Sequence, residues 1–377
     1  MQRLFFLLFV ALAVGCLPQQ PPAKQPSTEV LPAAASLQTE NVFLITFDGL
    51  RWQELFTGAD SSFFGDKQFV HLPDSAALMQ RFWHEDPEQR RARLMPFFWS
   101  TLAQEGQLYG NHALGNRVHC VNQQWFSYPG YNEILTGYAD PAVNSNRKIY
   151  NENLTVLEFF QQQEKLNGKV AAFASWDVFP YIIHDERSGI PVNAGFRAAE
   201  GDDLTEMEQR LNQQQQEIAS PWATVRHDYF THHYALEYLQ KHQPRVMYIA
   251  YGETDDFAHD GRYDAYLKSA HLVDGYIGEL WDYVQSHERY RNKTTFIITT
   301  DHGRGYLSKD AWRSHGTDIE GADEIWLAVI GPDSPARGEV TAKGQFYQNQ
   351  LARTVAHLMG YEFNANPEMG EALSVIF

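Results

Sequence analysis

Three apolar segments of the sequence each run directly into acidic or histidine residues, and this arrangement restricts the fold more than any other feature. The segments and the residues that follow them are 42–47 with Asp48-Gly49, 247–251 with Gly252 to His259, and 296–300 with Asp301-His302-Gly303. Short apolar runs rich in β-branched and aromatic residues are typical of buried strands. Because open α/β sheets bind ligands at the carboxyl ends of their strands, the pattern predicts one site at that edge.

Strands alternate with helical patterns along the chain, which is typical of a mainly parallel sheet covered on both faces. The predicted strands are residues 41–47, 169–175, 246–251, 294–300 and 325–330, and the predicted helices are 95–105, 155–164, 222–242, 263–286 and 348–359. We therefore expect an α/β fold, a three-layer sandwich with a mostly parallel central sheet, formed by one domain over residues 41–377.

Two polar and irregular stretches interrupt this alternation, at residues 53–93 and 182–220. Long segments that do not fit the rhythm of a fold are commonly functional loops. We predict that both are cap insertions over the carboxyl edge of the strands and that they select the substrate.

The N-terminus has the features of an export signal. Arg3 precedes an apolar stretch at 4–14, which is too short to span a bilayer comfortably. Residues 13–16 resemble the lipobox of bacterial lipoproteins, which implies a signal peptide at 1–15 and a lipid anchor to the membrane through Cys16. The alternative is an ordinary signal peptide with an incidental cysteine.

Residues 16–40 contain many Pro, Gln, Ala and Ser residues and cannot bury a core, so we predict a tether between the membrane and the folded body. Lipoproteins retained at the inner membrane carry Asp after the acylated cysteine, whereas this chain has Leu17. The expected location is the bacterial cell envelope, at the periplasmic face of the outer membrane.

The net charge of −17 argues against a nucleic-acid polymer as partner, because an acidic protein has no positive field to gather phosphate groups. An anionic substrate would have to be attracted locally, for instance by bound metal.

Carboxylate and imidazole groups together are a ligand set for zinc, manganese and similar divalent ions. Asp255 and His259 are four residues apart and share a face if their segment is helical. Asp301 and His302 are adjacent at a strand end, and His315 follows in the next loop. Any one of these histidines alone would more simply be a surface or core residue, but their joint placement predicts a metal site.

Segment 126–137 supplies the candidate nucleophile, Ser127. A serine oxygen that binds a metal ion is deprotonated near neutral pH and needs no histidine base. The alternative interpretation is structural, since Pro129-Gly130 is also a common turn leading into a short helix.

The order of these motifs resembles the alkaline phosphatase superfamily over residues 41–360. The motifs are Asp48-Gly49, Ser127-Tyr128-Pro129-Gly130 with Thr136-Gly137, Asp255-x-x-x-His259, Asp301-His302-Gly303 and His315-Gly316. The resemblance looks closest to the nucleotide pyrophosphatase/phosphodiesterase branch, which includes bacterial alkaline phosphatase family proteins. Its nucleophile is the Thr of a Thr-Phe-Pro-Asn segment; here Ser127 replaces the Thr and Gly130 replaces the Asn.

This resemblance implies two divalent metal ions, Zn²⁺ or alternatively Mn²⁺. The implied ligands are Asp255, His259 and His315 for one ion, and Asp48, Asp301 and His302, with Ser127 bridging toward it, for the other. It also implies that an Asn after the nucleophile helix binds an oxygen of the phosphoryl group; Asn144 and Asn146 both lie in this region, and Asn146 is the predicted residue.

The implied function is hydrolysis of a phosphoric ester of a small substrate through a phosphorylated Ser127. Phosphodiesterase, nucleotide pyrophosphatase and phospho-group transferase activities share these ligands and remain open. A surface lipoprotein that only binds metal or ligand is the non-enzymatic alternative, but it has no need of a metal-bound nucleophile. Sulfatase activity is not expected, because residues 120–124 do not match the Cys-x-Pro-x-Arg segment of that branch.

Overall fold

The computed structural model describes residues 31–33 and 36–377. The predicted signal peptide at 1–15, the predicted lipid anchor Cys16 and most of the predicted tether at 16–40 lie outside the described residues. Within the described ranges, no helix combines the length and the hydropathy needed to cross a bilayer.

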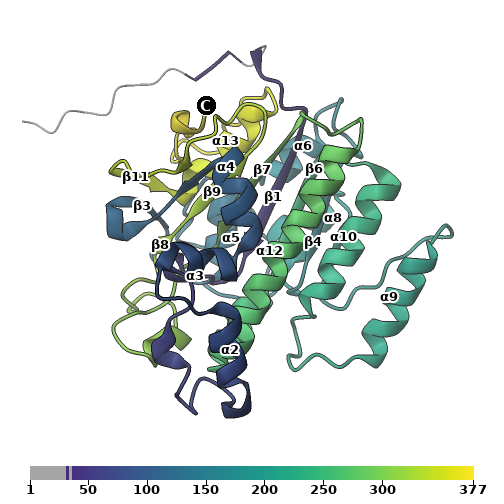
Figure 1. The fold of residues 1–377 in the computed structure, drawn as a ribbon. Coiled ribbons are helices and arrows are strands. Elements are labelled where there is room, and N and C mark those ends of the chain that lie inside the picture. The colour runs from purple at the N-terminus through teal and green to yellow at the C-terminus, as the bar shows by residue number, and fades with distance from the viewer. Residues whose placement is uncertain (1–30, 34–35) are drawn as a thin grey trace, which may run out of the picture. The chain divides into compact units, whose positions relative to one another are not determined.

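The central sheet has eight strands in the order β10-β2-β9-β7-β1-β6-β4-β5 (Figure 1). Their bounds are β1 (Asn41–Phe47), β2 (Gln107–Tyr109), β4 (Val170–Ala174), β5 (Val192–Ala194), β6 (Val246–Tyr251), β7 (Thr294–Thr300), β9 (Leu327–Ile330) and β10 (Gly338–Glu339). Strands β7, β1, β6, β4 and β5 run parallel, whereas β9 is antiparallel to β7 and β2. The predicted α/β fold with a mostly parallel sheet is confirmed.

Strand register brings the ends of the three central strands to one level. Phe47 of β1 pairs with Tyr251 of β6 and with Thr300 of β7, and each is the last residue of its strand. All residues of the three strands are buried, as expected of parallel strands covered on both faces. The segments that begin at Asp48 and Asp301 therefore leave the sheet side by side.

Helices cover both faces of the sheet (Figure 1). Alternate residues of β1 face opposite cores, Phe43 and Ile45 on one side and Val42 and Leu44 on the other. The first core contains α10 (Asp228–His242) and α12 (Tyr263–Ser286), and the second contains α5 (Ser127–Thr136), α6 (Val156–Gln161) and α13 (Leu351–Leu358). Further α-helices are α1 (Trp52–Thr57), α2 (Ser75–Phe82), α3 (Pro87–Leu94), α4 (Ala103–Glu105), α7 (Phe179–Ile183), α8 (Asp185–Ser188), α9 (Glu206–Glu217) and α11 (Glu253–His259).

A second sheet has three strands in the order β11-β3-β8. Its strands are β3 (Asn116–His119), β8 (Glu324–Ile325) and β11 (Gly344–Tyr347). Only Trp326 separates β8 from β9, yet the two strands belong to different sheets. The single strand predicted at 325–330 was wrong, because the chain passes from one sheet to the other within it.

The strands predicted at 41–47, 246–251 and 294–300 have the bounds of β1, β6 and β7. The helix predicted at 222–242 was wrong at its start, since α10 begins at Asp228. Residues 221–224 form bends, and Val225 forms a β-bridge with Trp176.

The two stretches predicted as insertions contain regular elements. Residues 53–93 hold all of α2 and most of α1 and α3, and Figure 1 shows α2 at the end of the molecule toward which β1 runs. Residues 182–220 hold α9 but also β5, which pairs in parallel with β4. The second stretch is therefore in part an edge of the sheet, built by a strand too short to give a periodic pattern.

The folded body begins before Asn41. The backbone N–H groups of Gln38 and Thr39 donate to the carboxylate of Asp333 at 2.9 and 2.7 Å, and the Thr39 hydroxyl donates to it at 2.6 Å. The end of the predicted tether, up to Glu40, is thus fixed to the domain.

Replacing Asp333 by Ala is expected to lower the free energy of unfolding by about 1–3 kcal/mol, because these three donors lose their acceptor and Thr39 is buried. Urea unfolding of the variant tests this. The matched control is Glu288→Ala, which removes an exposed carboxylate. Equal urea midpoints for the two variants would contradict the anchoring role.

Candidate metal centre

The turn after β1 requires a glycine. Gly49 has a φ of 59°, and its N–H donates to Asp301 Oδ1 at 3.1 Å. A Cβ atom at this position would lie 2.7 Å from Arg304 Nη1 and 2.8 Å from Asp255 Oδ1. The absence of a side chain therefore lets Asp48, Asp255 and Asp301 approach one another closely.

Asp48, Asp301 and His302, called here the aspartate group, bring together three buried ligand atoms that have no hydrogen-bond partner. These atoms are Asp48 Oδ1, Asp301 Oδ2 and His302 Nε2. Nε2 lies 3.4 Å from Asp48 Oδ1 and 3.5 Å from Asp301 Oδ2. Buried polar atoms without a partner are costly, and carboxylate oxygen with imidazole nitrogen is a zinc ligand set. The aspartate group therefore fits a divalent cation.

The other atoms of these side chains are held by the protein. The Tyr131 hydroxyl donates to Asp48 Oδ2 at 2.9 Å, and His302 Nδ1 lies 2.9 Å from the Gly303 carbonyl oxygen. If Nδ1 carries the proton and donates it to that carbonyl, Nε2 presents its lone pair to the cavity. The protein thus orients each ligand and leaves one atom of each unused.

Asp255, His259 and His315, called here the histidine group, lie beside the aspartate group. His259 Nε2 is 3.1 Å from Asp255 Oδ2 and 3.0 Å from His315 Nε2. Asp255 and His259 face the same side of α11, four residues apart, as the spacing predicts. The rings of His302 and His315 stack with centroids 3.9 Å apart, so the two groups are adjacent.

Charge is unevenly balanced across the two groups. Burial raises the pKa of Asp48 well above its ordinary value, and the charge of Asp255 raises it further. Burial and the charge of Asp48 do the same to the pKa of Asp301. Burial also acts on Asp255, but Arg304 and His259 outweigh it and hold the pKa of that carboxyl well below its usual range. The aspartate group is therefore the part of the site that most lacks positive charge.

Ser127 is placed by three contacts of the segment that contains it. His315 Nδ1 lies 3.1 Å from the carbonyl oxygen of Trp125, and Tyr131 reaches Asp48. Gly130 packs against Asp301 so closely that a Cβ there would lie 2.4 Å from the Asp301 carbonyl oxygen. Ser127 is the buried first residue of α5, between these contacts. The segment that contains Ser127 therefore contacts residues of both ligand groups.

Asn146 also lies at the start of α5. Its Oδ1 accepts a hydrogen bond from the backbone N–H of Tyr128 at 3.0 Å. Because this contact uses the amide oxygen, the amide NH₂ group is left as a donor near the start of α5. Asn144 instead donates to the Pro141 carbonyl oxygen at 3.4 Å.

Sequence reasoning missed Arg304 and the role of Tyr131. Arg304 is fully buried, contacts Asp255, and donates to the carbonyl oxygens of Trp312 and Arg313 at 2.7 and 2.6 Å. Its position directly after the Asp301-His302-Gly303 motif was the sequence feature that could have identified Arg304 as a site residue. Tyr131 had no such feature, since its hydroxyl reaches Asp48 only in the folded chain.

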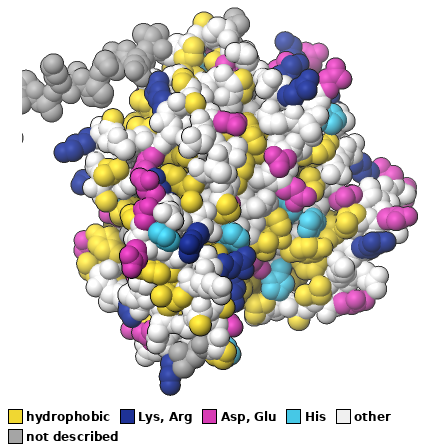
Figure 2. Space-filling model, in the orientation of Figure 1, with side chains coloured by type: hydrophobic (Ala, Val, Ile, Leu, Met, Phe, Trp, Pro, Cys, Tyr) yellow, Lys and Arg dark blue, Asp and Glu magenta, His cyan; other side chains and the backbone are white. Residues whose placement is uncertain are grey.

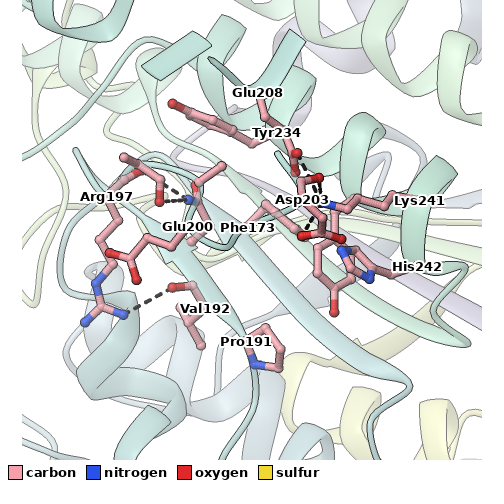
Figure 3. A pocket seen from close by; sticks show the side chains of 14 residues that line it. Phe173, Pro191, Val192, Arg197, Glu200, Asp203, Glu208, Tyr234, Lys241 and His242 are labelled. Atoms are coloured by element: carbon pink, nitrogen blue, oxygen red, sulfur yellow. Dashed lines mark hydrogen bonds and ion pairs between the residues drawn. The ribbon is translucent and has the colours of Figure 1, made fainter. Parts of the chain in front are cut away.

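A cavity of about 440 Å³ lies away from these residues, among β4, β5, α9 and α10 (Figure 3). Lys241 in its wall pairs with Asp203 at 3.1 Å and Glu208 at 3.3 Å, as the dashed lines in Figure 3 show. None of the predicted site residues lines this cavity.

Comparison with known proteins gives one family match and several structural ones. A sequence model of the Metalloenzyme superfamily matches residues 203–360, a range that contains Asp255, His259, Asp301, His302 and His315. No curated protein matches the sequence significantly. The family match supports the predicted dependence on divalent metal ions.

Many solved structures share the fold. Alkaline phosphatase PafA superposes with a TM-score of 0.58 at 10% identity, over 92% of this chain and 99% of its own. A protein of the alkaline phosphatase superfamily from Vibrio parahaemolyticus gives 0.53 at 13% identity, over 90% and 71%. The lipoteichoic acid synthase LtaP from Listeria monocytogenes gives 0.52 at 12% identity, over 92% and 79%. The predicted alkaline phosphatase-like fold is confirmed.

Tyr131→Phe is expected to weaken zinc binding about 10–100-fold, because Asp48 loses the hydrogen bond that orients it. Competition with a chromophoric chelator measures the affinity. Tyr290→Phe is the matched control, since it removes a buried hydroxyl that donates to the Pro244 carbonyl oxygen away from both groups. The same zinc affinity in both variants would show that Tyr131 does not support the site.

Proposed function

We propose that this chain, whose fold is that of the alkaline phosphatase superfamily, is a metal-dependent phosphoric ester hydrolase that acts through Ser127. The observation that carries the proposal is the convergence of buried, unpartnered ligand atoms next to the helix that begins at Ser127. A protein that only binds metal could use the same ligands, but a hydroxyl held beside them serves a reaction.

The aspartate group would hold one divalent cation and the histidine group a second. Bound cations would supply the charge that lowers the pKa of a serine hydroxyl and stabilises the entering and leaving oxygens of phosphoryl transfer. Burial, with the neighbouring His302 ring, holds the pKa of His315 well below its usual range, so this ligand is neutral as metal binding requires. The donor set suits zinc, with manganese as the alternative.

In the proposed reaction Ser127 Oγ attacks the phosphorus atom and displaces the alcohol, which leaves with a proton. Water then attacks the phosphoserine, phosphate leaves, and Ser127 regains its proton. The positive end of the ten-residue helix α5, which begins at Ser127, would stabilise a phosphoryl group bound there. The Asn146 amide group, oriented by Tyr128 N–H, would donate to a phosphoryl oxygen.

The proposed substrate is a small phosphorylated molecule. A net charge of −17 disfavours a nucleic-acid polymer, and on the face shown in Figure 2 the Lys and Arg side chains are scattered among Asp and Glu. A cation pair would instead attract one phosphate group locally. Whether the ester is a monoester, a diester or a nucleotide pyrophosphate depends on groups around the site, and the assay below separates the monoester from the diester.

We also propose attachment to the periplasmic face of the outer membrane through acylated Cys16. The proposal rests on the apolar segment that ends at this residue and on the proline-rich stretch after it. Cys16→Ala expressed in a Gram-negative host is expected to move the protein from the membrane fraction to the soluble periplasm. Retention of the variant in the membrane fraction would contradict lipid anchoring.

Ser127→Ala is expected to reduce hydrolysis of aryl phosphate esters at least ~10³-fold, because the attacking oxygen is lost. The zinc-loaded protein from Leu31 onward, which keeps the Gln38 and Thr39 contacts with Asp333, would be assayed with an aryl phosphate monoester, an aryl phosphate diester and an aryl sulfate. Ser286→Ala is the matched control, because it removes a serine hydroxyl from the exposed end of α12.

The ester that the wild type hydrolyses fastest identifies the class of its substrate. Loss of activity in Ser127→Ala with unchanged zinc content supports the covalent mechanism. Wild-type turnover by that variant would rule out Ser127 as nucleophile, and turnover of aryl sulfate alone would overturn the phosphoric ester assignment.

A further inference from the structure

A second cluster of metal-ligating side chains lies on the three-stranded sheet, outside the centre described above. His112 begins a short 3-10 helix (His112–Leu114), His119 ends β3, and Glu324 begins β8. One ligand atom from each residue lies within 4.8 Å of the other two. We propose that these three residues form a further binding site for a divalent transition-metal ion, with zinc as the best match.

Strand pairing accounts for two of the three ligands. His119 and Glu324 are directly opposite each other in the antiparallel pair of β3 and β8. Residues opposite each other in such a pair project to the same face of the sheet, with their Cβ atoms close together. The pairing therefore brings an imidazole and a carboxylate together whether or not an ion is present.

His112 is held in the orientation that a ligand needs. Its Nε2 lies 3.1 Å from the Ile325 carbonyl oxygen, so the proton belongs on Nε2 and the lone pair on Nδ1. Nδ1 faces Glu324 Oε1 at 3.9 Å. The Trp52 ring stacks on the imidazole with centroids 5.2 Å apart and limits its rotation. This backbone hydrogen bond from the second ring nitrogen is typical of metal-binding histidines.

Glu324 is oriented in the same way. Its Oε2 accepts a hydrogen bond from Trp52 Nε1 at 2.8 Å, which leaves Oε1 toward His112. The separation of 3.9 Å between Oε1 and His112 Nδ1 is too long for a hydrogen bond. Two ligands of a tetrahedral zinc ion are about 3.3 Å apart, given zinc–ligand distances of ~2.0–2.1 Å. A small side-chain movement would therefore place both atoms on one ion.

His119 completes the set. Its ring is edge-on to that of His112, with centroids 4.9 Å apart, and its Nε2 lies 3.9 Å from Asp323 Oδ2. The amide nitrogen of Gln345 lies 2.8 Å from His119 Nδ1. The same amide nitrogen donates to the Phe346 carbonyl oxygen at 3.0 Å, so for His119 Nε2 to become the ligand atom the Gln345 side chain must move away and Nδ1 must take the proton. Asp323 or a water molecule would take the fourth position.

The neutral form of the two imidazoles also suits a metal ion. Burial lowers the pKa of His112 and of His119, and for His119 the neighbouring His112 lowers it further. Both imidazoles are thus neutral at neutral pH, which is the form that coordinates. Two histidines and one carboxylate are an established zinc ligand set.

An ion here would link parts of the chain that also shape the main centre. Trp52, which contacts two of the ligands, follows Asp48 in the next segment of the chain. The backbone of Glu324 packs against Gly303, where a Cβ atom would lie 2.3 Å from the Glu324 carbonyl oxygen. We therefore assign the site a structural role, the stabilisation of these segments, and the assignment does not depend on the proposed hydrolase activity.

The first test is the zinc content of full-length protein that has been stripped with chelator, reloaded with excess zinc and desalted. The wild type is expected to retain one equivalent more than His112→Ala or His119→Gln, whereas the control His71→Gln, in which an exposed histidine is changed, retains the wild-type number. Equal zinc content in all four proteins would overturn the proposal.

The second test locates the ion and does not depend on variants that fold. Crystals of the wild type grown with excess zinc would be measured at the zinc absorption edge. An anomalous peak between His112, His119 and Glu324 is the expected result. Absence of a peak at this position overturns the proposal, whatever the occupancy of the main centre.

Discussion

The structure of the site depends on three neighbouring strands, β1, β6 and β7, that end at the same level of the sheet. β1 lies between β6 and β7, and the register aligns the last residues of all three strands. Because the strands are parallel and completely buried, the first polar residues after them lie together at the carboxyl edge of the sheet. Asp48, Asp301 and His302 meet there, although Gly49 and Asp301 are 252 residues apart in the chain. The site is thus a consequence of how the sheet is ordered.

This meeting of acidic groups creates an electrostatic problem that the protein alone solves only in part. Arg304 is a buried cation in the site, and it forms an ion pair with Asp255. Asp48 and Asp301 receive neutral donors instead, from Tyr131 and Gly49, and each keeps one buried oxygen without a partner. A sequence selected for stability alone would replace such carboxylates with apolar residues. Their retention in the core is understandable if a cation completes the arrangement.

The parts of the fold and site that were predictable from the sequence are those with a local signal. Buried strands such as β1 and β7 are recognisable as apolar runs in the sequence. Asp48 and Asp301 are recognisable as candidates because each directly follows one of these runs. Contacts that exist only after folding left no such signal. β5 has three residues and is too short to show a periodic pattern. The contact of His112 with the Ile325 carbonyl oxygen joins residues 213 positions apart in the chain. α5 was obscured by Pro129 and Gly130, residues that usually mark a turn.

Gly130 and Gly303 interrupt the sequence pattern of a helix or strand, but each allows two backbone segments to approach closely. Gly130 lets α5 approach the Asp301 backbone, and Gly303 lets the segment after His302 approach that of Glu324, with its N–H donating to the Ala322 carbonyl oxygen at 2.8 Å. A methyl group at either position would push apart two backbones that carry ligands. Backbone contacts of this kind do not yield by side-chain rotation, so they set the distance from Ser127 to the aspartate group more firmly than side-chain packing could. Gly303 is also the point of contact between the main centre and the histidine and glutamate cluster, because it follows His302 in the chain and packs against the backbone of Glu324.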